Sequence, residues 1–164
     1  MSKSEEFLKL AFAGESQANR EYLAFAQKAD QEGFSQAAKL FRAASEAEAV
    51  HALNHLRAMK GIGSTKDNLQ KAISGEKHEF QKMYPEMIKA AEDEGNKEAR
   101  RTFNYANEVE KVHASLYESA LNELGNQDTF SYYVCPVCGY TSAKEAPETC
   151  SVCGTKGKLF KKID

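Results

Sequence analysis

The sequence predicts a mainly α-helical protein, in which a four-helix bundle is followed by a small C-terminal ribbon that holds a metal ion. Three observations favour this fold class. Residues 1–127 are rich in Ala, Glu, Lys, Leu and Gln, which are strong helix formers, whereas residues 128–164 hold all four cysteines. The helical part also contains an internal repeat. We therefore expect one domain over 1–127 and a small second domain over 128–164.

Glycine residues divide the first domain into four long segments. Glycine is typical of helix C-termini because it adopts the left-handed backbone conformation without strain. The glycines at these breaks are Gly33, Gly61, Gly63, Gly95 and Gly125. Their spacing predicts helices over about 4–32, 35–60, 67–94 and 96–124.

Single residues refine this helix assignment. Ser35 and Asn96 directly follow two of the glycine breaks, where a short polar side chain can cap the first backbone N–H groups of a helix. Pro85 lies inside the third segment, where its ring removes one helical hydrogen bond. We therefore expect the third helix to bend near Pro85.

Two helical hairpins of similar sequence make up the first domain. Residues 44–52 (ASEAEAVHA) and 106–114 (ANEVEKVHA) agree at six of nine positions, at an offset of 62 residues. Gly-Glu pairs at 14–15 and 75–76 recur at nearly the same offset. The period is too long, and the copies are too few, for a solenoid. Two such hairpins predict a four-helix bundle with pseudo-twofold symmetry.

Acidic and histidine side chains fall on the apolar stripes of these helices. Apolar residues recur at three- and four-residue steps in each helix, so each set lines one face that ought to be buried. An ionised carboxylate in a dry core is very costly unless it is paired or bound to a metal. The charged and histidine residues on these faces are Glu15, Glu48, His51, Glu76, Glu79, Glu110 and His113.

Their spacing indicates a pair of metal ions. In Glu48-x-x-His51 and Glu110-x-x-His113 both side chains leave the same helix face one turn apart, so each motif can offer one nitrogen and one bridging carboxylate. Two divalent ions would offset the repulsion between the carboxylates. Oxygen-rich ligation with one His per metal suits iron or manganese better than zinc. Glu79 exceeds the symmetric set of two lone glutamates and two Glu-x-x-His motifs.

A less specific interpretation of these motifs is a solvated helix surface. A single Glu-x-x-His is common, and Glu48 could pair with a lysine. Two copies on inward faces, each with a glutamate on the partner helix, make that interpretation weak. Glu46, Glu108 and His78 are expected on outer faces, and His55 is expected to pack beside the site.

The cysteines form two matched knuckles, CPVCG from residue 135 and CSVCG from residue 150, with eleven residues between Cys138 and Cys150. Each pair can supply two of the four ligands of a tetrahedral metal site. So short a segment needs a bound metal ion or a similar cross-link to fold. Zinc ribbons share this spacing, so the pattern alone leaves zinc and iron open. A redox-active pair is disfavoured because two knuckles recur at ribbon spacing. The four expected ligands are Cys135, Cys138, Cys150 and Cys153.

Taken together, these residues resemble the rubrerythrin family, which joins a ferritin-like di-iron bundle to a rubredoxin-like domain. The resemblance covers nearly the whole chain. It is carried by residues 14–18 (GESQA), both Glu-x-x-His motifs, residues 75–79 (GEKHE), residues 83–85 (MYP) and the two cysteine knuckles. Ser151 stands where the family usually has proline.

The resemblance implies roles for the acidic residues on the helices. Glu48 and Glu110 would bridge two irons, Glu15 would bind one iron, and Glu76 with His113 would bind the other. These assignments come from the family and not from the spacing itself.

The resemblance also implies a mobile ligand and two supporting tyrosines. The first iron would exchange Glu79 for His51 between its oxidised and reduced states. Tyr22 and Tyr84 match family tyrosines that hydrogen-bond the ligand carboxylates. A third iron, with zinc as the other possibility, would occupy the tetracysteine site.

The implied function is the reduction of hydrogen peroxide to water at the di-iron site, as protection against oxidative stress. Electrons would return through the Fe(Cys)4 centre, ultimately from NAD(P)H by way of a reductase or a small carrier such as rubredoxin. Two other functions stay open: a ferroxidase or iron-handling protein, and a zinc-ribbon binding module on a helical bundle.

Composition argues against several other classes. Lys and Arg total 22 against 24 Asp and Glu, a net charge of -2, so the basic excess of a nucleic-acid binder is missing. The longest apolar runs, such as residues 22–26, are far shorter than the roughly 20 residues that cross a bilayer. The N-terminus lacks the apolar core of a signal peptide, so we expect a cytoplasmic protein.

The short link between the second and third helices predicts something about assembly. In a ferritin-like bundle these helices run parallel, and the link must climb roughly 30 Å. Seven steps from residue 60 to residue 67 reach about 25 Å at most. We therefore expect either a separate crossover segment over 67–75 or a homodimer in which the third and fourth helices are exchanged.

Overall fold

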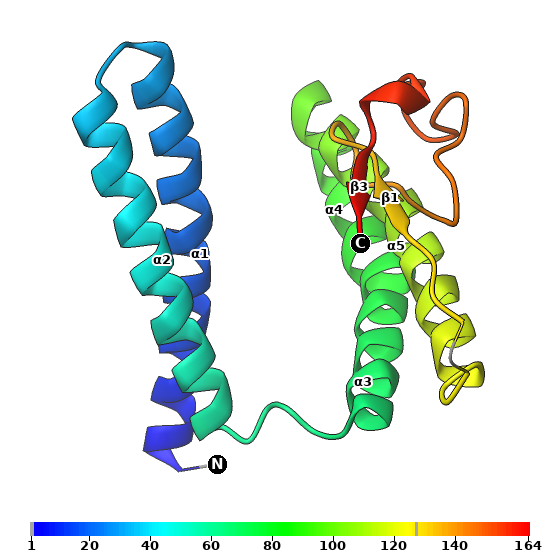
Figure 1. The fold of residues 1–164 in the computed structure, drawn as a ribbon, viewed down its shortest axis with the longest axis horizontal. Helices are drawn as coiled ribbons and strands as arrows, with labels where there is room; N and C mark the ends of the chain where they lie inside the picture. The colour runs from blue at the N-terminus through cyan, green and yellow to red at the C-terminus, as the bar shows by residue number, and fades with distance from the viewer. Residues whose placement is uncertain (1, 127) are drawn as a thin grey trace. The chain divides into compact units, whose positions relative to one another are not determined.

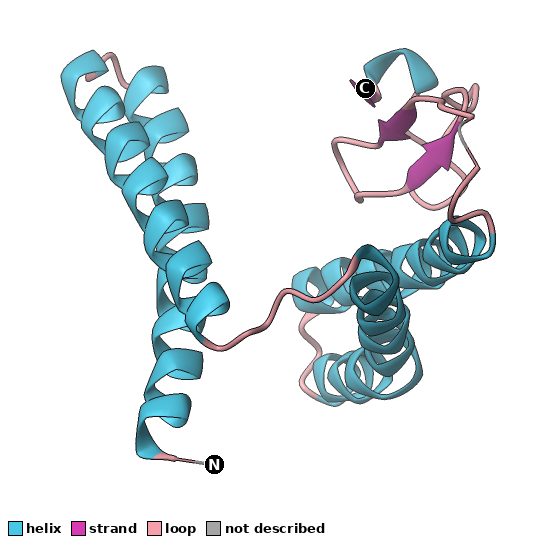
Figure 2. Cartoon of the chain, turned by 60° about the horizontal axis from the view of Figure 1, so that its bottom comes forward, coloured by secondary structure: helices cyan, strands magenta, loops and turns pink. Residues whose placement is uncertain are grey.

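A computed structural model describes residues 2–126 and 128–164, which divide into two compact units (Figure 1). Unit 1 extends to Gly63, and unit 2 comprises Ser64–Asp164. Helices dominate, and the strands of the described chain lie in its C-terminal part (Figure 2). The predicted mainly α fold class with a small C-terminal ribbon is confirmed. The expected domain boundary falls at residue 127, which lies outside the described residues, and it stays a prediction.

Unit 1 is a helical hairpin of α1 (Lys3–Gln31) and α2 (Ser35–Ala58). Ser2 and Glu5 begin α1 with a reciprocal cap: the Glu5 N–H donates to Ser2 Oγ at 3.3 Å, and the Ser2 N–H donates to the Glu5 carboxylate at 2.7 Å. The expectation that Ser35 caps α2 is wrong. Phe34 holds the cap position, because its N–H closes the turn on the Ala29 carbonyl at 2.8 Å and Ser35 is already helical.

The core of unit 1 consists mainly of small side chains. Its buried alanines are Ala26, Ala29, Ala38 and Ala52. The fully buried Ser45 hydroxyl donates to the Asn19 carbonyl at 3.0 Å, and the Asn19 amide donates to the Ser45 carbonyl at 2.7 Å. Small residues let the two helices approach closely, and this polar pair stabilises their register.

Unit 2 begins with one continuous helical stretch made of α3 (Thr65–His78), the π-helical turn η1 (Glu79–Met83) and α4 (Tyr84–Asp93). The irregularity expected at Pro85 takes the form of η1, because proline cannot donate to the carbonyl one turn before it. Residues 67–75 lie inside α3, so the expected separate crossover segment is wrong.

The next helix, α5 (Lys97–Asn122), begins as predicted. The Asn96 side chain accepts the Ala99 N–H at 3.1 Å and caps the helix. The observed helix bounds differ from the predicted ones by one or two residues at most ends. Such differences are expected because helix ends depend on local caps that the apolar pattern does not report.

The C-terminal ribbon is a small antiparallel sheet. It contains β1 (Tyr132–Val134), β2 (Thr141–Ala143) and β3 (Lys161–Ile163), in the order β2-β1-β3, and the short 3-10 helix η2 (Gly157–Leu159) precedes β3. Strand β2 contacts α5, so the ribbon is attached to the helices of its own unit. No helix in the described part of the chain has the length and apolarity needed to cross a membrane.

Candidate metal centres

The structure brings six of the seven predicted helical ligands together in two groups of three. The unit 1 triad contains Glu15, Glu48 and His51, and the unit 2 triad contains Glu76, Glu110 and His113. Within each triad the candidate ligand atoms all lie within 4.8 Å of one another. Each triad joins a lone glutamate of one helix to the Glu-x-x-His motif of the next, as the sequence repeat predicts.

The unit 1 triad is the more open of the two. His51 Nδ1 lies 2.9 Å from Glu48 Oε2, because residues three apart share one helix face. The His51 side chain is 54% exposed, whereas Glu48 is 19% exposed. The imidazole therefore stands at the edge of this triad, and the carboxylate lies further inside.

The unit 2 triad is more enclosed. His113 Nδ1 lies 2.8 Å from Glu110 Oε2 and 4.0 Å from Glu76 Oε2. The exposed fractions are 28% for the histidine and 15% and 17% for the two glutamates. The same imidazole nitrogen thus faces both carboxylates, which is the arrangement that a metal ion bound between them requires.

The two glutamates of the unit 2 triad repel each other when both are charged. Burial, the charge of Glu110 and a hydrogen bond with Glu110 together raise the pKa of Glu76 to about 7. The hydrogen bond with Glu110 likewise raises the pKa of His113. A divalent cation would replace the shared proton and neutralise the paired carboxylates, so the donor chemistry of this triad fits iron.

Glu79, the predicted exchanging ligand, stands outside the triad. It is the first residue of η1, one helical turn after Glu76. Burial and the charge of Glu110 raise the pKa of Glu79, so its carboxyl lies within the electrostatic influence of the triad. The part of the ligand assignment that concerns Glu79 stays a prediction.

Two tyrosines accompany the unit 2 triad, and the sequence predicted one of them. Burial, followed by the charges of Glu110 and its neighbours, raises the pKa of Tyr84. Burial and the charges of Glu76 and Glu110 raise the pKa of Tyr117, which was not among the predicted site residues. Its position one turn after His113 on the same stripe was the available signal.

Tyr22, the other predicted tyrosine, lies in an aromatic cluster of unit 1. Its ring centroid is 6.2 Å from that of Phe25 and 6.2 Å from that of Phe41. Such tilted aromatic contacts fix the position of the ring. Its expected hydrogen bond to a ligand carboxylate stays a prediction.

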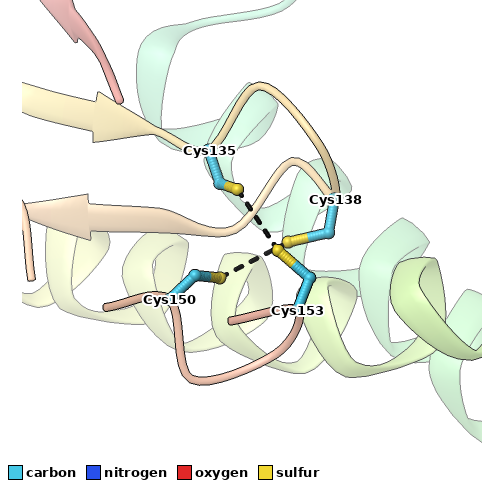
Figure 3. Close-up of side chains that lie close together, drawn as sticks. All are labelled: Cys135, Cys138, Cys150 and Cys153. Atoms are coloured by element: carbon cyan, nitrogen blue, oxygen red, sulfur yellow. Dashed lines mark hydrogen bonds between the residues drawn. The ribbon is translucent and has the colours of Figure 1, made fainter. Parts of the chain in front are cut away.

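The four cysteines converge as predicted, each pair from its own knuckle (Figure 3). Sγ of Cys135 lies 3.5 Å from that of Cys153, and Sγ of Cys138 lies 3.6 Å from that of Cys150. These separations are far too long for a disulfide. They match the edges of about 3.8 Å that follow from four sulfurs placed tetrahedrally at about 2.3 Å from one metal ion.

The backbone of the knuckles prepares this site for thiolates. The N–H groups of Gly139 and Gly154 donate to the carbonyls of Cys135 and Cys150 at 3.0 Å, and both glycines have positive φ. Burial opposes ionisation of Cys153, but hydrogen bonds with Thr155 outweigh it and lower its pKa to about 6. Burial raises the pKa of Cys138 in the same cluster, so one thiol ionises readily and another would lose its proton only when a metal ion binds.

One contact joins the ribbon to the unit 2 triad, and no sequence motif indicates it. His113 Nε2 lies 3.0 Å from Thr141 Oγ1, on strand β2. A mostly apolar cavity of about 340 Å³ borders this pair and is also lined by Leu116, Tyr117 and Val134. No local pattern marks Thr141, because its role depends on how the ribbon packs against α5.

Comparison with known families matches both parts of the chain. A family model described as Rubrerythrin matches residues 6–121, and a second, described as the rubredoxin-like domain of rubrerythrin, matches residues 133–161. The first match covers the residues of both triads, and the second covers all four cysteines.

Several relatives are similar to this chain over most of their length. Rubrerythrin-2 of Clostridium acetobutylicum is 38% identical, with 94% of each chain covered. Nigerythrin of Nitratidesulfovibrio vulgaris is 37% identical, over 90% of this chain and 80% of the relative. Rubrerythrin of Porphyromonas gingivalis is 35% identical, over 97% of this chain and 89% of the relative.

Solved structures of nigerythrin are also similar to this chain. The fully reduced, all-ferrous state gives a TM-score of 0.61 at 32% identity, with 99% of this chain and 88% of the other covered. The mixed-valence state gives a TM-score of 0.59 with the same identity and coverage.

Proposed function

This chain belongs to the rubrerythrin family, and we propose that it is a non-haem di-iron peroxidase that reduces hydrogen peroxide to water. One observation carries the proposal: a single chain holds two Glu-Glu-His triads and a tetrathiolate site. A storage protein has no need of the second kind of site, and a zinc-ribbon module has no need of the first. Membership of an oxidoreductase family supports the same conclusion.

The residues that would hold the irons are the seven predicted on the helices. Glu48 and Glu110 would bridge, Glu15 would bind one iron, and Glu76 with His113 would bind the other. Bound iron supplies the electrons: two ions, each giving one, provide the two electrons that convert one peroxide and two protons to two water molecules.

His51 and Glu79 are the two residues that would hold the first iron in turn, one in each oxidation state. His51 belongs to the unit 1 triad, and Glu79 lies one turn after Glu76 of the unit 2 triad. The raised pKa of Glu79 means that its charged form is disfavoured in the metal-free site. A nearby metal cation would stabilise that charged form.

Metal binding would release a proton from the paired carboxylates and leave the two phenols as the protonated groups beside the site. The carboxyl groups of Glu76 and Glu110 share a hydrogen bond, and a pKa of about 7 lets Glu76 hold a proton near neutral pH in the metal-free site. The raised pKa values of Tyr84 and Tyr117 keep both phenols protonated, so that they stay hydrogen-bond donors beside the site.

The tetracysteine site would act as the electron relay. Four thiolates around one iron exchange single electrons with little change in geometry. A rubredoxin-type protein or an NAD(P)H-dependent reductase would supply these electrons. Thiolate ligands persist in a reducing compartment, which favours the cytoplasm as the location.

A di-iron centre needs both triads, and the link between α2 and α3 is too short for one chain to supply both in a ferritin-like bundle. Glu48 lies about 15 Å before the end of α2, and Glu76 lies about 17 Å after the start of α3. If α2 and α3 run parallel, the link must span their sum of about 32 Å, whereas seven steps from Ala58 to Thr65 reach about 25 Å. The proposed assembly is therefore a homodimer with exchanged helical hairpins.

Metal analysis with a visible spectrum tests the proposal. The purified chain should contain about three irons and show the red colour of a tetrathiolate ferric site, which bleaches on reduction. Anaerobic addition of peroxide should oxidise the reduced protein and be consumed in proportion to its iron. A colourless zinc protein that leaves peroxide untouched would contradict the proposal.

A further inference from the structure

The two triads differ in what holds their histidines. In the unit 2 triad both ring nitrogens of His113 have partners, Glu110 on one side and Thr141 on the other. In the unit 1 triad His51 Nδ1 contacts Glu48, and no hydrogen bond to its Nε2 is found among the residues that the structure describes. The partner of His113 comes from the ribbon, which has no counterpart in unit 1.

The contact continues through the ribbon toward the cysteines. The Thr141 hydroxyl lies 3.0 Å from His113 Nε2 and donates to the Gly139 carbonyl at 3.1 Å. Gly139 directly follows Cys138, and its own N–H donates to the Cys135 carbonyl at 3.0 Å. A hydroxyl that donates to a carbonyl keeps its lone pairs free to accept, so the Nε2–H of His113 can donate to Thr141.

We propose that Thr141 is a positioning residue for the metal site of the helices, which orients His113 so that Nδ1 faces the carboxylates and Nε2–H donates into the ribbon. Through Gly139 the same hydroxyl connects the helical ligand set to the cysteine knuckle by a continuous chain of covalent and hydrogen bonds. The inference rests on the proposed metal centre and assigns to it a residue outside the helices.

The apolar surroundings of this contact favour the hydrogen bond between His113 and Thr141. The adjoining cavity is lined mostly by apolar side chains, so water competes weakly for the Nε2–H group. Metal-bound histidines almost always donate their second ring N–H to such a partner, and loss of that partner typically lowers metal affinity by about 10- to 100-fold. Thr141 is in the position that this general rule requires.

Nuclear magnetic resonance of the zinc-loaded full-length chain, with 15N-labelled histidine, tests the contact directly. Zinc is diamagnetic and accepts the same ligands. The His113 Nε2–H proton should be protected from exchange with water in the wild type and in Thr141→Ser, and its signal should be lost in Thr141→Val. His78, which is exposed and belongs to neither triad, serves as the internal reference, since its signals should not change. Ser142→Ala, on the same strand, is the matched control.

Metal titration gives the second readout. With the tetracysteine site filled by colourless zinc, Co²⁺ binding by Thr141→Val should be about 10- to 100-fold weaker than in the wild type, and Thr141→Ser should restore it. The proposal would be overturned if Thr141→Val bound Co²⁺ as tightly as the wild type and kept the His113 Nε2–H signal. It would also be overturned if Thr141→Val and Thr141→Ser lost Co²⁺ affinity to the same extent. A wild type that binds no Co²⁺ on its helices would overturn the proposed metal centre itself.

Discussion

At the scale of single residues, Glu76 carries the clearest electrostatic signature of a metal ligand. Its pKa of about 7 lies above the ordinary value of 4.5, because the group is buried and faces Glu110. A carboxyl that binds its proton more tightly in the folded state loses stabilising free energy as pH rises from about 4.5 to about 7. The raised pKa of His113 acts in the same direction, since its contribution is lost as pH rises above 6.5.

The metal-free helices should therefore be less stable near pH 8 than near pH 5, and Glu76→Gln should reduce that difference. Glutamine resembles the protonated carboxyl and has no charge to repel Glu110. Thermal unfolding followed by circular dichroism at about pH 5 and about pH 8 measures the effect. Glu46→Gln, at an exposed position, should leave the pH dependence unchanged.

The sequence could predict the triads because their residues break an apolar pattern at fixed helical steps. Glu46, Glu108 and His78 were correctly placed on exposed positions by the same reasoning. Thr141 could not be predicted, because its role arises from packing between a strand and a helix 28 residues apart in the chain. Tyr117 could not be assigned to the site from the sequence, because an aromatic residue on an apolar stripe usually belongs to the core.

At the scale of elements, the ribbon depends on its metal. Its three strands have three residues each and bury little apolar surface, so metal binding supplies much of the folding free energy. Cys150→Ser should lose the tetrathiolate colour and the dispersed amide signals of the ribbon, while the helical circular dichroism remains. Ser151→Ala, at an exposed neighbouring position, should retain both. A Cys150→Ser ribbon that stays fully ordered would contradict this dependence.

The cap of α5 should contribute measurably to the stability of unit 2. Asn96→Ala removes the acceptor of the Ala99 N–H and should lower the free energy of unfolding by about 1 kcal/mol. Asn96→Asp keeps the acceptor and should cost little. Chemical denaturation of the two variants beside the wild type gives the comparison, and equal losses in both would show that the cap is not the cause.

Helix positions could be predicted closely because glycines and apolar periodicity mark them. The form of the irregularity before Pro85 could not be predicted. Both a bend and a π-helical turn are compatible with the missing N–H of proline, and the structure has the π-helical turn. The cap of α2 was missed for a similar reason. The tight turn at Gly33 uses backbone hydrogen bonds, so the polar side chain at Ser35 is not needed as a cap.

At the scale of the whole molecule, the proposed exchange of hairpins predicts complementation between inactive variants. Glu48→Ala damages the unit 1 triad and Glu110→Ala damages the unit 2 triad. In an exchanged dimer, one chain of each kind creates one intact centre, whereas an unexchanged dimer leaves every centre damaged. Co-expression of the two variants should restore roughly a quarter of the wild-type peroxide consumption if chains pair at random. No recovery in verified mixed dimers would exclude the exchange.

The colour of the tetracysteine site, followed after fully reduced protein is mixed with peroxide in the absence of oxygen, tests whether electrons pass from this site to the helical metal centre. In the wild type the red ferric absorption should return quickly, because electrons leave the tetracysteine iron for the helical site. In Glu110→Ala it should return about 10- to 100-fold more slowly, because a proposed metal ligand is missing. A Glu110→Ala protein whose colour returns at the wild-type rate would contradict the di-iron peroxidase account.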